Sequence, residues 1–366
     1  MEEYTPDTFK PLLAKLVKTP EYFAPDDLRR ALEHLFIPDA AHPTQIGAFL
    51  TAMHIKQVER RPETLAAASS VLRARAIKVA IEDDNKDFVV DIVGTGGDGH
   101  DTFNVSTTAA VVAAGAGARV VKHGSVASTS KSGSADLLER LECLFVAPTA
   151  GTTMHIPRIP FTFILAPHYH PALSVIAPYR KLLPFRTLFN MIGPLTNPAC
   201  PRGMVLGVAE RDLGLPFAKS LCDSHVERAL VVCGAEGLDE ISCAGDTWVW
   251  ELKDGNITET TLHPTHFGLR THPLKSVSGG TALQNAETFK ALLTSGSEIP
   301  NELTPALEFV LMNASALLVV AGIASDYKDG VRLAMESVTS GAAWKALEAF
   351  REAGRAAMAK VEREEK

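Results

Sequence analysis

Residues 91–107, DIVGTGGDGHDTFNVST, have the composition of a loop that binds a phosphorylated ligand. From Gly94 onward the glycines follow a G-x-G-x-x-G spacing, and the backbone N–H groups of glycines can approach a phosphate closely. Asp98 stands among them, and an acid beside a phosphate needs ribose hydroxyls or a divalent cation as its partner. Residues 104–107, NVST, supply amide and hydroxyl groups at the start of a predicted helix, whose N-terminus favours an anion. The loop therefore predicts a site for a sugar diphosphate, with a tight turn that binds nothing as the alternative.

Two common nucleotide-binding motifs do not fit this loop. A dinucleotide-binding loop needs an acid about 20 residues further on to hold the ribose hydroxyls. Residues 115–120 read GAGARV and contain no acid. The motif G-x-x-x-x-G-K-[ST] is also absent, because Lys131 follows Ser130 and not a glycine. These observations argue against NAD and against a P-loop nucleotide site.

A second polar segment, KHGSVASTSKSGSADLLE, spans residues 122–139. It combines Lys122 and Lys131 with a series of serines, and compact positive charges with hydroxyls suit phosphate oxygens. A solvent-exposed loop without a ligand is the alternative. Because this segment follows the next predicted strand after the glycine loop, we expect the two loops to converge.

Two adjacent acids, Asp239 and Glu240, follow the apolar run ALVVCG at residues 229–234. Neighbouring carboxylates in a loop at a strand end are suitable ligands for a hard cation, and Mg²⁺ is the natural candidate beside phosphates. An isolated Asp-Glu pair is more often solvated surface. The position directly after a strand favours the metal interpretation.

The elements that position these loops alternate between strands and helices. Short β-branched runs predict buried strands, and helical stretches separate them. The predicted strands are 88–93, 118–124, 161–167, 203–209 and 229–234, with a helix at 106–117. This alternation predicts an α/β fold with a mainly parallel sheet and helices on both faces. Asp254-Gly255 predicts a hairpin within 248–262, and the chain from about 281 onward is predicted to be largely helical.

The N-terminal part of the chain differs from the rest. The first eighty residues predict helices only, with helices opening at Pro25, Pro43 and Pro62. The charged stretch 82–87 then predicts a domain boundary.

The bulk composition limits the classes of function. The chain has 366 residues and a net charge of −7, which disfavours broad nucleic-acid binding. Its five cysteines form no C-x-x-C pair, which is typical of a reduced intracellular protein. The polar N-terminus shows no signal peptide, and we expect no apolar run long enough to span a bilayer. We therefore expect a cytoplasmic protein that has no membrane or nucleic-acid partner.

Taken in order, the motifs GTGGDG-x-x-TFNVST, KHG-x-x-x-S-x-SKSGSAD and GLDE resemble the anthranilate phosphoribosyltransferase family. APHYHP at 166–171 and FNMIGPLTNPA at 189–199 strengthen the resemblance, which covers about residues 25–350. It implies transfer of the phosphoribosyl group of phosphoribosyl diphosphate (PRPP) to the amino group of anthranilate, with Mg²⁺, in tryptophan biosynthesis. It also implies a homodimer formed through a helical domain.

The resemblance further implies a small all-helical domain joined to a larger α/β domain whose mainly parallel central sheet is flanked by helices. The helical domain would comprise residues 1–86 and be rejoined by about 171–198. The PRPP-binding α/β domain would comprise residues 87–170 and 199–366.

Site residues are implied motif by motif. PRPP would be bound by Gly97, Asp98, Thr102, Asn104, Ser106, Thr107, Lys122, Ser130 and Ser134. Mg²⁺ would be bound by Ser106, Asp239 and Glu240. Anthranilate would be bound by Gly94, His170 and Arg180, with Ser125 as a weak candidate. The family pattern after Lys-His-Gly is Asn-Arg, and here it is Ser125-Val126, so a shorter side chain without an amide stands at 125.

No catalytic side chain is singled out, and we expect electrostatic catalysis by the groups that bind the substrates and the metal. His123, His168 and His170 are candidates for a general base or for orienting a substrate. Two other functions have the same implied architecture: a pyrimidine nucleoside phosphorylase and a non-catalytic nucleic-acid-binding relative. The glycine loop and the net charge disfavour them, respectively.

Overall fold

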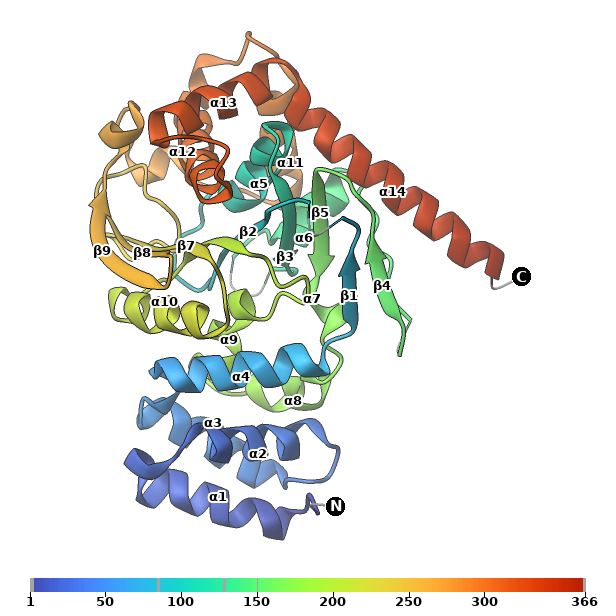
Figure 1. Ribbon diagram of the computed structural model, residues 1–366, viewed down its shortest axis with the longest axis vertical. Helices are drawn as coiled ribbons and strands as arrows, with labels where there is room; N and C mark the ends of the chain where they lie inside the picture. The colour runs from blue at the N-terminus through green and yellow to red at the C-terminus, as the bar shows by residue number, and fades with distance from the viewer. Residues whose placement is uncertain (1–2, 84–85, 128–129, 150, 365–366) are drawn as a thin grey trace.

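A seven-stranded sheet lies at the centre of the molecule between two layers of helices (Figure 1). The structure is a computed structural model and describes residues 3–83, 86–127, 130–149 and 151–364. In spatial order the strands are β5 (Phe161–Leu165), β3 (Arg119–Gly124), β2 (Val89–Gly94), β6 (Gly203–Gly207), β7 (Arg228–Gly234), β8 (Thr247–Lys253) and β9 (Asn256–Leu262). The pairings from β5 to β7 are parallel, and β8 and β9 continue the sheet antiparallel. The predicted α/β class and mainly parallel sheet are confirmed.

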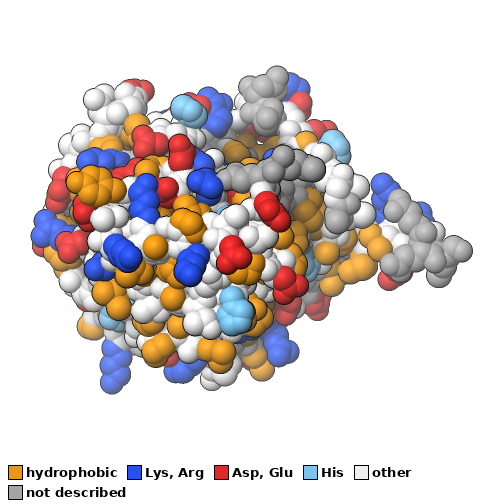
Figure 2. Space-filling view, turned by 90° about the horizontal axis from the view of Figure 1, so that it is seen from below, with side chains coloured by type: hydrophobic (Ala, Val, Ile, Leu, Met, Phe, Trp, Pro, Cys, Tyr) orange, Lys and Arg blue, Asp and Glu red, His pale blue; other side chains and the backbone are white. Residues whose placement is uncertain are grey.

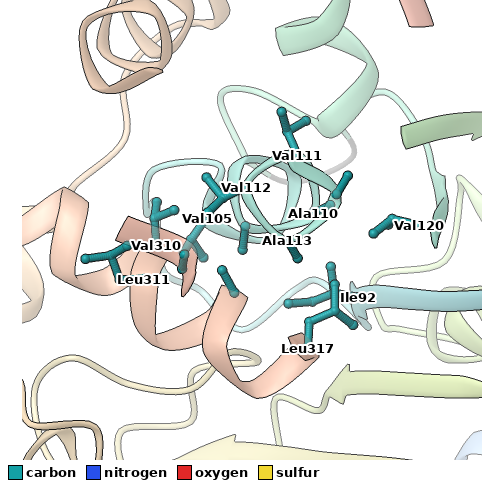
Figure 3. Packing of buried hydrophobic residues seen from close by; sticks show 14 of the residues in the cluster. Ile92, Val105, Ala110, Val111, Val112, Ala113, Val120, Val310, Leu311 and Leu317 are labelled. Carbon is teal, nitrogen blue, oxygen red and sulfur yellow. The ribbon is translucent and has the colours of Figure 1, made fainter. Parts of the chain in front are cut away.

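One face of the sheet is covered by a core of closely packed apolar helices. α5 (Val105–Gly115) is buried at every residue from 107 to 114, which is typical of a helix that is apolar all round. Figure 3 shows its valines and alanines packed close to Val310 and Leu317 of α12 (Thr304–Ala321) and to Ile92 and Val120 of the sheet. The further helices on this side are α6 (Ser134–Arg140), α11 (Ala282–Thr294), α13 (Tyr327–Thr339) and α14 (Ala342–Glu364).

The other face is covered by α10 (Gly214–Asp223), which packs on α4 (Pro62–Arg75). Beyond α4 lie α1 (Pro6–Lys18), α2 (Pro25–Phe36) and α3 (Pro43–Ile55). The predicted helices that open at Pro25, Pro43 and Pro62 are confirmed as α2, α3 and α4. A proline occupies the first position of each of these four helices, where its missing N–H costs nothing. One apolar core runs from these helices to this face of the sheet. The helical part is therefore packed on the sheet and not tethered to it by a linker.

Residues after β5 return to the helical part. α7 (Ala166–Tyr169) follows that strand directly, and α8 (Leu173–Arg180) packs on α2 and α3. α9 (Leu188–Met191) also contacts α3. The division of the chain into domains at 86, 170 and 198 stays a prediction, and this packing is consistent with it.

The expectation that the first eighty residues form only helices is wrong for their last few residues. Lys78–Ile81 forms β1, which pairs in parallel with β4 (Thr153–Ile156) in a separate two-stranded sheet. The run KVAI is short, and its partner strand comes much later in the chain. No local pattern could therefore reveal the pairing.

The hairpin predicted at Asp254-Gly255 is confirmed, and both residues adopt positive φ, 50° and 74°.

The expectation that no apolar run is long enough to span a bilayer needs a correction. Within the described ranges, the segment Asn301–Ala321 is long and apolar enough to cross a membrane by composition, although most of it is buried inside the protein. It contains α12, and its apolar side chains belong to the core shown in Figure 3.

Candidate active site

Four neighbouring parallel strands end at one edge of the sheet, and each ends on a glycine. These strand ends are Gly94 of β2, Gly124 of β3, Gly207 of β6 and Gly234 of β7. The three loops singled out in the sequence leave the sheet after β2, β3 and β7. Ligands of α/β proteins bind beyond the carboxyl ends of parallel strands, so this edge is the expected place for a site.

The glycine loop uses backbone conformations that other residues adopt with difficulty. Gly96 and Gly97 have φ of 67° and 71°, in the left-handed region that favours glycine. A Cβ at Gly97 would also lie 2.8 Å from the guanidinium carbon of Arg186. Asp98 is half-buried, and its Oδ1 accepts a hydrogen bond from the backbone N–H of His100 at 3.0 Å.

The second loop meets the glycine loop at Asn104. Its Nδ2 donates to the carbonyl of Ser132 at 2.9 Å, and the Ser132 hydroxyl donates to Asn104 Oδ1 at 3.1 Å. Asn285 of α11 donates to the same Oδ1 at 2.7 Å. The predicted convergence of the two loops is confirmed for these residues. Residues 128 and 129 of the second loop lie outside the described ranges.

The loop that carries Asp239 and Glu240, called the acidic loop below, reaches the glycine loop because β2 and β6 both end on a glycine, which has no side chain. Asp239 Oδ2 accepts a hydrogen bond from the backbone N–H of Gly96 at 2.5 Å. A Cβ at Gly94 would lie 2.3 Å from that oxygen, and a Cβ at Gly207 would lie 1.6 Å from the Asp239 carbonyl oxygen. The two glycines thus leave the space in which the carboxylate of Asp239 reaches the glycine loop.

The acids at this edge are held in an environment that disfavours their negative charge. Burial, with the charge of Asp98, raises the pKa of Asp239 to about 7. Burial and the charge of Asp239 raise the pKa of Glu240, which Lys122 and a hydrogen bond from Ser106 oppose. Crowded buried carboxylates of this kind are relieved by a bound cation.

The donor set fits a magnesium ion better than a transition metal. Within the described part of the chain, no group of three or more His, Cys, Asp or Glu residues has the arrangement of a metal site. Mg²⁺ typically uses one or two carboxylates and fills its other positions with water and substrate phosphates. Asp239 and Glu240, with the hydroxyl of Ser106, supply hard oxygen donors of that kind.

The side chain of Lys122, on β3, reaches the backbone of the neighbouring strand β2. Its ammonium is buried and donates to the carbonyl of Ile92, close to Asp91 and Glu240. Burial lowers the pKa of Lys122, and the carboxylate of Asp91 opposes that effect. Burial also raises the pKa of Asp91 to about 6. Here the lysine offsets buried acids, and its contact with a phosphate stays a prediction.

Two buried histidines border the same edge. The rings of His123 and His170 meet edge to face, with centroids 5.2 Å apart and an interplanar angle of 72°. Burial lowers their pKa values to about 3 and about 4, so both are neutral at pH 7. Nε2 of His123 and both ring nitrogens of His170 are buried from solvent and have no well-formed hydrogen bond among the described residues, although the backbone at Thr196 lies close enough to His170 to oppose the lowering of its pKa.

Arg180 and Ser125 have few side-chain contacts in the structure. Among the described residues, the half-buried guanidinium of Arg180 donates only to the carbonyl of Phe189 at 3.4 Å, and burial lowers its pKa. Arg180 can therefore pair with an anionic ligand without breaking an ion pair.

The carbonyl of Ser125 accepts hydrogen bonds from the hydroxyl of Ser134 at 3.2 Å and from the backbone N–H of Ala135 at 3.1 Å.

Comparison with known proteins decides the family. A model described as "Glycosyl transferase family, a/b domain" matches residues 86–344, and one described as "Glycosyl transferase family, helical bundle domain" matches residues 10–76. The anthranilate phosphoribosyltransferase of Schizosaccharomyces pombe is 44% identical over 311 residues, which is 85% of this chain and 87% of that protein. The chain belongs to the anthranilate phosphoribosyltransferase family.

Solved structures of anthranilate phosphoribosyltransferases have the same fold. The Saccharomyces cerevisiae enzyme in complex with PRPP and Mg superposes with a TM-score of 0.88 at 31% identity, covering 97% of this chain and 100% of that chain. The enzyme from Thermus thermophilus superposes with a TM-score of 0.82 at 34% identity, covering 94% of this chain and 99% of that chain.

Two residues that the sequence analysis missed connect the returning segment of this anthranilate phosphoribosyltransferase family member to the loops. Arg186 donates to the carbonyls of Thr95 at 3.1 Å and Gly97 at 3.4 Å, and its positive charge opposes the raised pKa of Asp239. The buried Asn197 donates to Asp91 Oδ2 and to the carbonyl of Val121, both at 2.9 Å. FNMIGPLTNPA was recognised as a family motif, but nothing local indicated these contacts.

The remaining residues implied by the family lie on the same loops. Thr102 forms an isolated bridge with Ser278, which holds the glycine loop to the segment before α11. The exposed Ser130 donates to the carbonyl of Ser132 at 3.4 Å, and Thr107 is buried in the first turn of α5. The individual ligand roles of the family residues stay predictions.

Proposed function

We propose that this chain transfers the phosphoribosyl group of PRPP to the amino group of anthranilate, giving N-(5-phosphoribosyl)anthranilate and diphosphate, as a step of tryptophan biosynthesis. The observation that carries this proposal is that the three loops meet at one edge of the sheet. Asp239 accepts a hydrogen bond from Gly96 of the glycine loop, and Glu240 is hydrogen-bonded to Ser106. The named relatives and the PRPP and Mg complex of the yeast enzyme support it.

The reaction exchanges one bond at C1 of the ribose. The amine nitrogen of anthranilate bonds to C1, the bond from C1 to the diphosphate oxygen breaks, and the amine loses a proton. Negative charge grows on the departing diphosphate while the sugar acquires cation-like charge. Mg²⁺ held by Asp239, Glu240 and Ser106 would neutralise the charge on the diphosphate.

In this proposal the protein's own groups bind and orient the two substrates. Backbone N–H groups and hydroxyls of residues 97–107, with the hydroxyls of Ser130 and Ser134, bind the phosphates and the ribose. On the other side, the guanidinium of Arg180 pairs with the anthranilate carboxylate. Holding both substrates in one orientation removes much of the entropic barrier.

The neutral histidines fit the aromatic side of the reaction. The rings of His123 and His170 place no positive charge near the cation-like sugar. In this proposal the amine, or a water molecule that takes its proton, bonds to one of these buried ring nitrogens when the substrates are in place. Ser125 is too short to replace the asparagine of the family pattern without a bridging water.

We also propose a cytoplasmic homodimer that associates through the helical part, formed by 1–86 and 171–198. Figure 2 shows the helical end of the molecule, with hydrophobic side chains scattered between lysines and arginines. The exposed large hydrophobic side chains of this part are Val17, Tyr22, Ile55 and Leu182. Such side chains favour a partner surface over water.

The fluorescence of anthranilate tests the proposed activity directly. We expect it to disappear when protein, PRPP and Mg²⁺ are all present, and to persist when any one of them is left out. A parallel assay supplies uridine or thymidine with inorganic phosphate. Release of the free base in that assay, with unchanged anthranilate fluorescence, would replace the proposal with a pyrimidine nucleoside phosphorylase.

A further inference from the structure

A pocket lies near the amino ends of β6 and β7, at the opposite end of these strands from the three loops. Its volume is about 220 Å³. It is lined by the end of α4, the segment 194–202, the start of β6 and the turn after α10. The pocket therefore lies where the helical part, the returning segment and the sheet meet.

Basic residues line this pocket, and no acidic residue does. The residues that line it include Arg73, Arg202 and His225 but no aspartate or glutamate, in a chain that has 43 acids and a net charge of −7. Arg202 is paired with Glu227, with N···O distances of 2.6 and 3.1 Å. Arg73 is thus the cation whose charge is not offset.

The contacts of Arg73 involve only neutral groups. It donates to the carbonyl of Leu195 at 2.5 Å and to the hydroxyl of Ser224 at 3.2 Å. Over the described ranges, no carboxylate lies within ion-pair distance of its guanidinium. Burial lowers its pKa, and the only nearby ionisable group that opposes this effect is the thiol of Cys200.

Two other arginines show what this environment means. Arg119 is also desolvated, but Asp87 offsets its charge. Arg180, on the proposed anthranilate side, is partly buried and has no acid that offsets its charge, as is the case for Arg73. A partly desolvated guanidinium that has no acid beside it raises the free energy of the folded protein unless an anion binds to it. Arg73 therefore has the same electrostatic character as an arginine for which we propose an anionic substrate.

The walls around Arg73 suit an apolar group. Leu195, Met204, Leu221 and Val226 line the pocket together with two prolines. A cavity of about 150 Å³ lined by apolar side chains is large enough for benzene, so this pocket has room for one ring and a small charged group. An inorganic anion would leave the apolar wall uncovered.

We propose that this pocket binds a small organic carboxylate with one ring, placing the carboxylate on Arg73 and the ring against Leu195 and Leu221. This site is separate from the proposed active site. The competing explanation is purely structural: Arg73 fastens α4 to the segment around Leu195 and to α10, and nothing binds.

Cys200 supplies a reporter inside the pocket of the unmodified protein, because it is exposed and lines the same wall. We would follow its alkylation by neutral iodoacetamide with peptide-resolved mass spectrometry. A ligand of benzoate size is expected to bind with a dissociation constant on the order of 1 mM. Benzoate at ten times that concentration should then slow alkylation of Cys200 about tenfold. The half-buried Cys222, which does not line the pocket, should react at an unchanged rate.

Benzamide and inorganic phosphate distinguish the chemistry. Benzamide has the ring without the charge, and phosphate has the charge without the ring, so neither should protect Cys200. Equal protection by benzamide, equal protection by phosphate, or no protection by benzoate would each overturn the proposal.

Two variants locate the effect. Arg73→Met should abolish protection by benzoate, whereas Arg180→Met should keep it, because benzoate bound on the anthranilate side does not shield Cys200. The buried Cys143, Cys233 and Cys243 show whether a variant is folded, since they become reactive if it is not. Protection retained in folded Arg73→Met, or lost in folded Arg180→Met, would contradict the assignment. If Arg73→Met does not fold, the comparison of benzoate with benzamide on the wild-type protein still decides.

Discussion

At the scale of single residues, the structure controls charge mainly by burial. His123 and His170 are neutral because burial disfavours their protonated forms. The same effect raises the pKa values of Asp239 and Asp91, so these acids need a cation to stay ionised. Lys122 is one such cation, and a metal ion is the other that we propose. Asp91 therefore has its cation within the chain, whereas the pair Asp239 and Glu240 would gain most from a cation bound from outside.

The neutral state of His170 predicts a pH dependence of stability. Its pKa of about 4 in the folded protein lies below the ordinary value of 6.5, so the unfolded chain binds a proton first as the pH falls. Its contribution is fully present above pH 6.5 and is lost as the pH falls toward 4. The loss reaches about 2 kcal/mol at pH 5.

The variant His170→Asn removes this titration. We expect the fall in the free energy of unfolding between pH 7 and pH 5 to be smaller by about that amount than in the wild-type protein. Urea unfolding followed by circular dichroism at both pH values measures it. Groups common to both proteins cancel in the difference, except His123, whose pKa the charge of His170 also lowers. An identical fall in the two proteins would show that His170 binds its proton as readily in the folded protein as in the unfolded chain.

At the scale of elements, the strand ends determine how close the loops can approach. β2 and β6 end opposite each other at Gly94 and Gly207, and the acidic loop that follows β7 passes over both. The contact between Asp239 and Gly96 depends on this approach.

Replacing one of these glycines should move the acidic loop. In Gly207→Ala the new Cβ would lie 1.6 Å from the carbonyl oxygen of Asp239, so the loop has to shift. We expect a loss of about 1–3 kcal/mol in stability and a clear loss of Mg²⁺-dependent turnover. Thermal unfolding and the anthranilate fluorescence assay measure the two effects.

The control is Gly245→Ala, since Gly245 has negative φ and a methyl group added there would meet nothing within 4 Å. It should leave both quantities unchanged. Full stability and turnover in Gly207→Ala would mean that the close approach of the acidic loop is unimportant.

The three loops could be predicted from the sequence because each follows a short β-branched run and has an unusual polar composition. β1 and β4 could not, because KVAI and TMHI are short and pair only with each other, far apart in the chain. Arg186 and Asn197 were missed for a related reason. Each acts on residues of another segment, and only the folded chain brings those residues together. The burial of Lys122 against Ile92 likewise depends on the neighbouring strand.

At the scale of the whole molecule, the helical part and the sheet share one apolar core, and the helical end still exposes hydrophobic side chains. Tyr22 and Ile55 are 69% and 67% exposed. Figure 1 shows α1, α2 and α3 at one end of the molecule, separated from the sheet by further helices. A partner bound to these outer helices would therefore leave the sheet edge open to substrates.

We expect a particle of twice the 39.3 kDa chain mass by light scattering after gel filtration. The double variant Tyr22→Asp with Ile55→Asp should shift it to the monomer, because two charges would be buried in the interface. Leu283→Asp is the matched control, since Leu283 is 56% exposed on α11, outside the helical part. A wild-type monomer, or a double variant that stays dimeric, would contradict association through this surface.

The central claim is that Asp239 and Glu240 hold the cation that binds the diphosphate. Calorimetric titration of PRPP, with and without Mg²⁺, into the wild-type protein and into Asp239→Asn with Glu240→Gln tests it most directly. We predict that Mg²⁺ strengthens PRPP binding to the wild-type protein by at least about tenfold, which is about 1.4 kcal/mol, and that the double variant loses this gain. A folded double variant that keeps the full effect of Mg²⁺ would contradict the account.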